Sequence, residues 1–171
     1  CSSGFCNNPT AETCLDPKLM ASGETVTSSW GASDDIRMTR EKYGGCFLDG
    51  TATSTAGLEK VYAVKLSAGE LLEASLSTDE PSAMLALFED CTNLDTCVAN
   101  NPTEGATTQY YYADAKTIVY LVVDATSSRP SGTFTLETTV TANKACPPGD
   151  TVCTGSDEVA ICDRAGARFV G

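Results

Sequence analysis

Short apolar runs separated by polar residues dominate the middle of the chain. Apolar and polar residues alternate at 62–66, 72–76 and 134–140, and this period of two predicts strands with one face against a core. Residues 84–88 and 118–123 are apolar throughout, as expected of strands that are buried on both faces at the centre of a sandwich. The pattern therefore predicts a series of short strands.

A further strand is expected where Tyr110, Tyr111 and Tyr112 follow one another. Side chains alternate along a strand, so Tyr111 should face the opposite way from its two neighbours. We interpret this run as a strand rather than as a binding site, because aromatic residues are enriched in strands.

Turn-forming residues separate the apolar runs, at 67–70, 79–81 and 127–132. Only residues 36–43 have a pattern that suits a short helix. Many short strands with polar turns and almost no helix predict an all-β fold, an antiparallel β-sandwich.

Composition divides the 171 residues into three zones. Residues 1–20 are rich in Cys, Asn and Pro and have no clear period, whereas residues 21–143 carry the strand pattern. Residues 144–171 return to Cys, Gly and Pro. We expect one sandwich domain at 21–143, flanked by short disulfide-rich terminal segments.

Acidic residues outnumber basic ones by 23 to 11, which gives a formal net charge of −12. Such a chain repels phosphate backbones and anionic lipids, so we expect neither nucleic-acid binding nor membrane-surface binding. The chain has no histidine, which excludes Ser-His-Asp and Cys-His nucleophile systems and His-ligated zinc. No apolar run approaches the roughly 18 residues of a membrane-spanning helix, so no transmembrane segment is expected.

Nine cysteines are the second unusual feature of the composition. None of them are spaced C-x-x-C, so the spacing does not support a zinc ribbon or a thioredoxin-type redox pair. Several lie a few residues apart in loop-like sequence, which is typical of structural disulfides in secreted or cell-surface proteins. The absence of a usable N-x-S/T sequon favours a bacterial source. Cys91 and Cys97 flank a five-residue loop, and this is the pairing we expect.

Most other cysteines gather near the two ends of the chain. Three lie in each terminal zone: Cys1, Cys6, Cys14, Cys146, Cys153 and Cys162. Because three cysteines cannot all pair among themselves, we expect the C-terminal set of one copy to bond to the N-terminal set of the next. Such a head-to-tail contact joins copies into an open fibre. Cys46 is then the odd one, either buried or paired outside these sets.

Two other interpretations of the terminal cysteines stay open. The start Cys1-Ser2-Ser3-Gly4 resembles a mature bacterial lipoprotein, in which the first cysteine is lipid-modified, and removing Cys1 leaves an even number of cysteines. Alternatively, the chain is a piece of a longer secreted protein, because domain boundaries commonly fall in Cys-, Pro- and Gly-containing segments.

The order of the apolar segments also resembles a known family. The resemblance is carried by residues 57–70, 84–88, 117–124 and 131–136, with the Cys91…Cys97 pair behind the second segment. In this order and spacing they are similar to a bacterial pre-peptidase C-terminal domain, over about residues 21–142. One departure is Glu59, where that family commonly has an aspartate.

This resemblance implies a jelly-roll-like sandwich that serves as a non-catalytic accessory module of secreted proteins. Such domains bind matrix or carbohydrate, hold calcium or act as spacers. In calcium-binding relatives, acidic residues ahead of the sandwich are ligands, so the resemblance makes Asp34 and Asp35 the candidate calcium ligands. Other acidic residues expected in loops are Asp79, Glu80, Asp90, Asp95, Asp114 and Asp124. Solvated loop acids that aid solubility explain the same residues, and no EF-hand loop is present.

The expected function is structural. Glycosidases use a pair of carboxyl groups, one of which has a raised pKa. Nothing in the sequence around the acidic residues would raise the pKa of one of them, so we do not expect an enzyme. Trp30 is interpreted as a core residue or an interface anchor. We expect a bacterial surface module that self-associates into an extracellular filament through its Cys-rich termini. The alternative is a calcium-binding accessory domain that targets a secreted hydrolase to matrix or polysaccharide.

Overall fold

The computed structural model describes residues 13–30, 59–93, 96–98, 107–125 and 132–142. It also describes the backbone of three short strands at 151–153, 159–162 and 169–170. The helix predicted at 36–43 and the turn predicted at 127–132, apart from Gly132, lie outside these residues.

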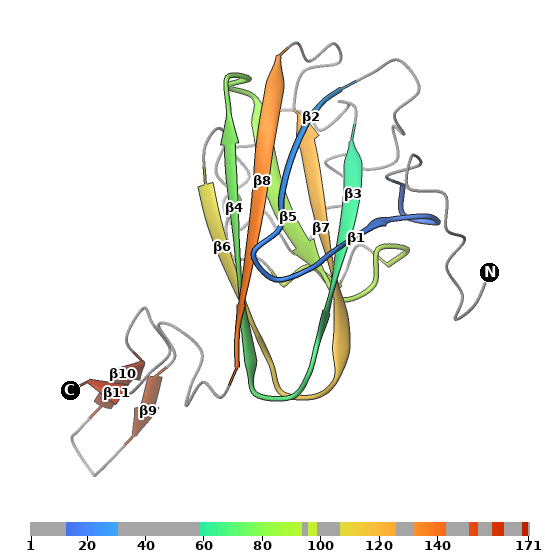
Figure 1. Cartoon of the computed structure of the whole chain (residues 1–171). Helices are drawn as coiled ribbons and strands as arrows, with labels where there is room; N and C mark the ends of the chain where they lie inside the picture. Colours follow the sequence, from blue (N-terminus) through green and yellow to red (C-terminus); the bar gives the residue numbers. More distant parts are fainter. Residues whose placement is uncertain are drawn as a thin grey trace.

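Two four-stranded sheets face each other and form the predicted β-sandwich (Figure 1). The first sheet consists, in spatial order, of β1 (Lys18–Met20), β3 (Lys60–Leu66), β7 (Thr117–Ala125) and β5 (Ala83–Phe88). The second consists of β2 (Thr25–Ser29), β8 (Thr133–Thr141), β4 (Glu70–Thr78) and β6 (Thr107–Ala113). All neighbours in these sheets pair antiparallel except β1 and β3, which run parallel. The all-β, mainly antiparallel fold class is confirmed.

The core lies between the sheets, where β4 and β8 supply alternate side chains as predicted. The burial of β8 switches from residue to residue, with Phe134 and Leu136 inside and Thr133 and Glu137 outside. Phe134 lies at the centre, with its ring centroid 4.9 Å from that of Trp30 and 6.3 Å from that of Tyr62. Trp30 is therefore a core residue, one of the two roles expected of it.

The first sheet is also buried on its other side. Residues of β3, β5 and β7 that point away from the main core form a second small cluster with cysteines: Val61, Ala86, Phe88, Val122, Cys14, Cys91 and Cys97. For this reason β3, predicted to be half-buried, is covered on both faces over most of its length. β5 is fully buried as predicted, but among the described strands it lies at the sheet edge rather than at the centre.

The prediction of a Cys91–Cys97 disulfide is wrong. Cys91 bonds to Cys14 instead, and the Cα atoms of these two residues are 5.6 Å apart. The chain after β5 turns back so that Cys97 lies opposite Phe88. Cys91 is three residues past that position, so it is not the cross-strand neighbour of Cys97. Cys97 is itself disulfide-bonded, and since Cys14 and Cys91 bond to each other, its partner is another cysteine.

The Cys14–Cys91 bond also changes the predicted division of the chain. The segment expected at 1–20 contains β1, which pairs with β3, so the predicted boundary at residue 20 lies too late. At the other end β8 finishes at Thr141, close to the predicted boundary. The C-terminal zone contains a small antiparallel sheet of β9 (Thr151–Cys153), β10 (Val159–Cys162) and β11 (Phe169–Val170).

In the part of the chain that the structure describes, no helix is long and apolar enough to span a bilayer.

Candidate functional site

One open surface of the sandwich is the solvent side of the β2-β8-β4-β6 sheet, here called the outer face. Its side chains are mainly hydroxyls with two carboxylates and one exposed phenol: Thr25, Thr27, Thr133, Thr135, Thr139, Thr141, Ser75, Ser77, Thr108, Glu73, Glu137 and Tyr110. Serine and the β-branched threonine suit the solvent-exposed side of a pleated sheet. The sheet register therefore turns four threonine- and serine-containing strands into one polar surface.

Hydroxyl groups on the outer face meet across neighbouring strands. Thr27 on β2 is opposite Thr135 on β8, and their Oγ1 atoms are 3.2 Å apart. Ser75 on β4 is opposite Thr108 on β6, with 3.0 Å between Oγ and Oγ1. In each pair either hydroxyl can donate, so each keeps capacity to bond to another molecule.

A shallow groove of about 320 Å³ lies at one end of the outer face, between the end of β4 and the start of β8. It is lined mainly by hydroxyls and one carboxylate, from Ser77, Thr78, Asp79, Thr133, Phe134 and Thr135. The Asp79 carboxylate accepts a 2.7 Å hydrogen bond from the Thr133 amide, which fixes it at the rim. Gly132 has φ +113° there, and a Cβ at that position would overlap the Asp79 carboxylate. The positive φ and the nearby carboxylate therefore favour a glycine at this position.

The tyrosine run divides as predicted between the two sides of β6. Tyr111 packs against the main core, and its hydroxyl donates a 2.8 Å hydrogen bond to Oε1 of Glu89. Burial, the hydrogen bond and the charge of Glu89 raise the pKa of Tyr111 to about 12, so it stays neutral at physiological pH. Tyr110 points the other way and is 39% exposed on the outer face. The sequence analysis interpreted Tyr110 only as part of a strand and did not place it in a functional site.

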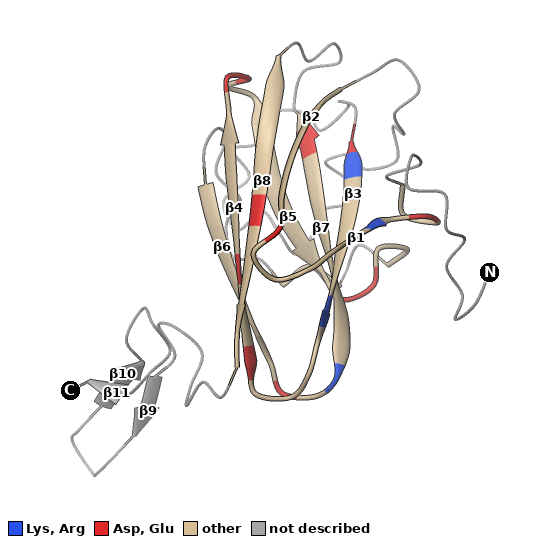
Figure 2. Cartoon of the chain, viewed as in Figure 1, with Lys and Arg blue, Asp and Glu red and all other residues tan. Residues whose placement is uncertain are grey.

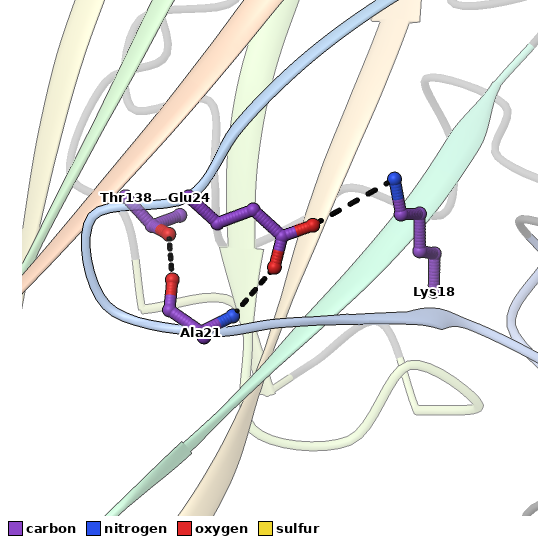
Figure 3. Close-up of polar contacts among 4 residues, drawn as sticks. All are labelled: Lys18, Ala21, Glu24 and Thr138. Atoms are coloured by element: carbon purple, nitrogen blue, oxygen red, sulfur yellow. Dashed lines mark hydrogen bonds and ion pairs between the residues drawn. The ribbon is translucent and has the colours of Figure 1, made fainter.

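The corner where the chain passes from β1 to β2 holds the two sheets together (Figure 3). Thr138 is fully buried on β8, and its hydroxyl donates a 2.9 Å hydrogen bond to the carbonyl of Ala21. Glu24 accepts a 2.9 Å hydrogen bond from the Ala21 amide and lies 3.8 Å from Lys18 Nζ. The amide of Gly23, at φ +77°, donates to the carbonyl of Thr138 at 2.7 Å. These contacts make the corner a structural element that fixes one edge of the outer face.

Replacing Thr138 with valine should lower the free energy of unfolding by about 1 kcal/mol, because the fully buried Thr138 then loses its hydrogen bond to the Ala21 carbonyl. Urea denaturation measures this loss. Thr139→Val is the matched control on the same strand, since Thr139 faces solvent and its replacement should cost less than about 0.5 kcal/mol. Equal stability of the two variants would contradict the structural role of Thr138.

Several acidic residues that we expected in loops are used to order turns. Oε1 of Glu80 accepts hydrogen bonds from the amide and hydroxyl of Ser82, at 3.2 and 2.6 Å. Oδ1 of Asp90 accepts from the hydroxyl and amide of Thr92, at 2.7 and 2.8 Å, and these bonds lower the pKa of Asp90. These carboxylates therefore stabilise local turns.

Asp114 and Asp124 were both expected in loops, but Asp124 lies within a strand. Asp114 precedes the start of β7, whereas Asp124 is the penultimate residue of that nine-residue strand. Asp124 is fully buried, and Glu59 is 1% exposed. Because Lys60 pairs with Val123, Glu59 and Asp124 are neighbours across β3 and β7. This buried acidic pair was not predicted, since only the register brings it together.

Most of the other predicted site residues lie outside the described part of the chain. These are Cys1, Cys6, Cys46, Cys146, Asp34, Asp35 and Asp95. Cys153 and Cys162 belong to β9 and β10, where their cross-strand neighbours are Val159 and Phe169. Among the described residues, no group of three or more Cys, Asp or Glu is arranged to hold a metal ion. The calcium ligands and the interchain cysteines therefore stay predictions, except that Cys14 bonds within the chain.

No family model matches the chain, and no curated protein matches it. Among solved structures, the pre-peptidase C-terminal domain of a collagenase from Bacillus anthracis matches with a TM-score of 0.41 and 14% identity. The match covers 70% of this chain and 91% of that domain. It belongs to the family that the order of apolar segments resembles. At this TM-score and identity, nothing about function follows from the match.

Proposed function

We propose that this chain is a non-catalytic, extracellular accessory module that attaches a secreted protein to a neutral polysaccharide through the outer face. The observation that carries the proposal is the continuous hydroxyl-rich surface formed by β2, β8, β4 and β6. A rigid sheet positions these groups without the entropy cost of ordering loops on binding.

The chemistry of the outer face suits sugar hydroxyls. A serine or threonine hydroxyl both donates and accepts, as a sugar hydroxyl does, and Glu73 and Glu137 add strong acceptors. Tyr110 adds an exposed ring beside Glu73, its cross-strand neighbour, and an aromatic ring offers a flat apolar surface with a polar tip. The groove beside Asp79 gives the surface a hollow at one end.

The net charge bears on the class of ligand, and the disulfide bears on the compartment in which the protein acts. The net charge of −12 disfavours anionic polymers, so the proposed ligand is a neutral polysaccharide. Figure 2 shows acidic residues at both ends of the sandwich and few basic ones among the described residues. The Cys14–Cys91 disulfide supports an oxidising compartment outside the cytoplasm.

A pull-down with insoluble neutral polysaccharides tests this proposal. The wild-type protein should sediment with at least one of cellulose, chitin or an insoluble glucan, and Tyr110→Ala should reduce the bound fraction several-fold. Leu15→Ala is the matched control, because Leu15 is an exposed apolar residue at 71% exposure that lies away from the outer face. Equal binding of the wild type and Tyr110→Ala, or no binding to any of these polymers, would refute the proposal.

We also propose that a bound calcium ion stabilises the sandwich. The buried pair Glu59 and Asp124 suits a hard cation, since carboxylate oxygens are preferred calcium ligands. Asp34 and Asp35 are the predicted further ligands.

If calcium binds there, adding it after chelation should raise the melting temperature, and Asp124→Asn should abolish the rise. Asp114→Asn, at the opposite end of β7, is the matched control and should keep the full calcium response. A melting temperature that ignores calcium in the wild type would dismiss the ion.

Covalent polymerisation through the terminal cysteines is a second candidate function. The observation in its favour is the odd number of nine cysteines, which leaves at least one without a partner inside the chain. With Cys14 and Cys91 bonded to each other, the six-cysteine contact expected at first loses one member. A ladder on a non-reducing gel that collapses with reductant would support the candidate, and a single monomer band in both lanes would refute it.

A further inference from the structure

The strand β6 is uncharged and, among the described strands, lies at an edge of its sheet. Its sequence is Thr-Thr-Gln-Tyr-Tyr-Tyr-Ala, with no Lys, Arg, Asp or Glu, as Figure 2 shows along its whole length. Of the described strands, only β4 pairs with it in its sheet, and Figure 1 shows it at the side of the sandwich. Natural sheets usually protect such edges with charges, proline or a bulge, because an edge strand is a template for another chain.

We propose that β6 is a homodimerisation edge, at which two copies pair antiparallel about a two-fold axis through Tyr110. This register places Tyr110 opposite its own copy, Gln109 opposite Tyr111, and Thr108 opposite Tyr112. All these pairs are uncharged, and aromatic cross-strand pairs stabilise antiparallel strands. A two-fold contact closes on itself and ends at a dimer.

The β6 edge lets a second copy of this acidic chain approach without a close pair of like charges in the Tyr110 row. The nearest charge in the Tyr110 row is Glu73 on β4. In the proposed dimer, three strand spacings of about 4.8 Å each separate Glu73 from its copy, or roughly 14 Å. That exceeds the Debye length of about 8 Å at physiological salt, so the two carboxylates barely repel each other.

Pairing at β6 joins the two outer faces. The result is one eight-stranded sheet in the order β2-β8-β4-β6-β6-β4-β8-β2, with its hydroxyl-rich surface continuous across the axis. A polymer lying along this surface would contact both copies, which raises its apparent affinity through multivalency. The dimer itself does not depend on the proposed ligand, because its evidence is the uncharged edge.

Sedimentation velocity over a concentration series, without any polysaccharide, tests the dimer. The protein is alkylated without reduction, so that Cys14–Cys91 stays intact and a free thiol cannot join copies. The wild type should shift from monomer to dimer, and Tyr110→Lys should weaken the dimer at least about tenfold by placing two like charges opposite each other. Thr139→Lys is the matched control, since Thr139 lies in the same row but on β8, away from the edge.

Mixing two opposite charges tests the register directly. Tyr110→Lys and Tyr110→Glu should each be largely monomeric, and an equimolar mixture should recover the dimer because Lys then faces Glu. A wild type that stays monomeric throughout the series would overturn the proposal, as would dimers of Tyr110→Lys as stable as those of Thr139→Lys. Matching melting temperatures of the variants exclude misfolding as the cause of a lost dimer.

Discussion

Replacing Phe134 with alanine should lower the free energy of unfolding by about 3–5 kcal/mol. The side chain is 1% exposed and lies between Trp30 and Tyr62, so its removal leaves a cavity at the centre of the core. Both the transfer of the ring out of water and the lost contacts of its neighbours contribute to this cost. Urea unfolding followed by circular dichroism measures the loss.

The control for this prediction is Thr135→Ala, one residue further along β8 but on the outer face. It should change stability by less than about 1 kcal/mol. A loss below about 1 kcal/mol for Phe134→Ala would show that the two sheets do not pack around this ring.

The double replacement of Cys14 and Cys91 by alanine should cost about 4 kcal/mol. The disulfide joins residues 77 positions apart, so its removal frees a long loop in the unfolded chain. It also removes the covalent link between the N-terminal turn and the cysteine-containing cluster on the first sheet. Thermal or urea unfolding of the double variant against the wild type measures the loss.

Fragment mass mapping of the non-reduced wild type is the matching chemical check. It should find the peptide that contains Cys14 bonded to the peptide that contains Cys91. A Cys91–Cys97 loop in that experiment, together with unchanged stability of the double variant, would contradict the account of the second cluster.

The sequence pattern predicted the second sheet better than the first. The alternation along β4 and β8 is visible because one face of their sheet meets water, so polar residues mark every second position. The first sheet is covered on both sides, and a run such as residues 84–88 then looks the same at an edge as at the centre. Periodicity reports burial, whereas strand order depends on contacts far apart in the sequence.

The disulfide and the outer face were difficult to predict for the same reason. Proximity along the chain favoured Cys91 with Cys97, but the turn after β5 moves Cys97 opposite Phe88 and leaves Cys91 facing Cys14. The threonine-rich side of residues 133–140 was evident in the sequence. Its continuation through Thr27, Ser75 and Thr108 depends on how β2, β4 and β6 are aligned in the sheet. No local sequence pattern contains that register.

The most direct measurement of polysaccharide attachment is a proton–nitrogen correlation NMR titration of the wild type with a soluble neutral oligosaccharide. The proposal predicts that amide shifts concentrate on the strands of the outer face, around Tyr110 and Thr139 and toward the groove at Asp79. Saturating shifts centred on β3 and β7, with the outer face unchanged, would contradict it.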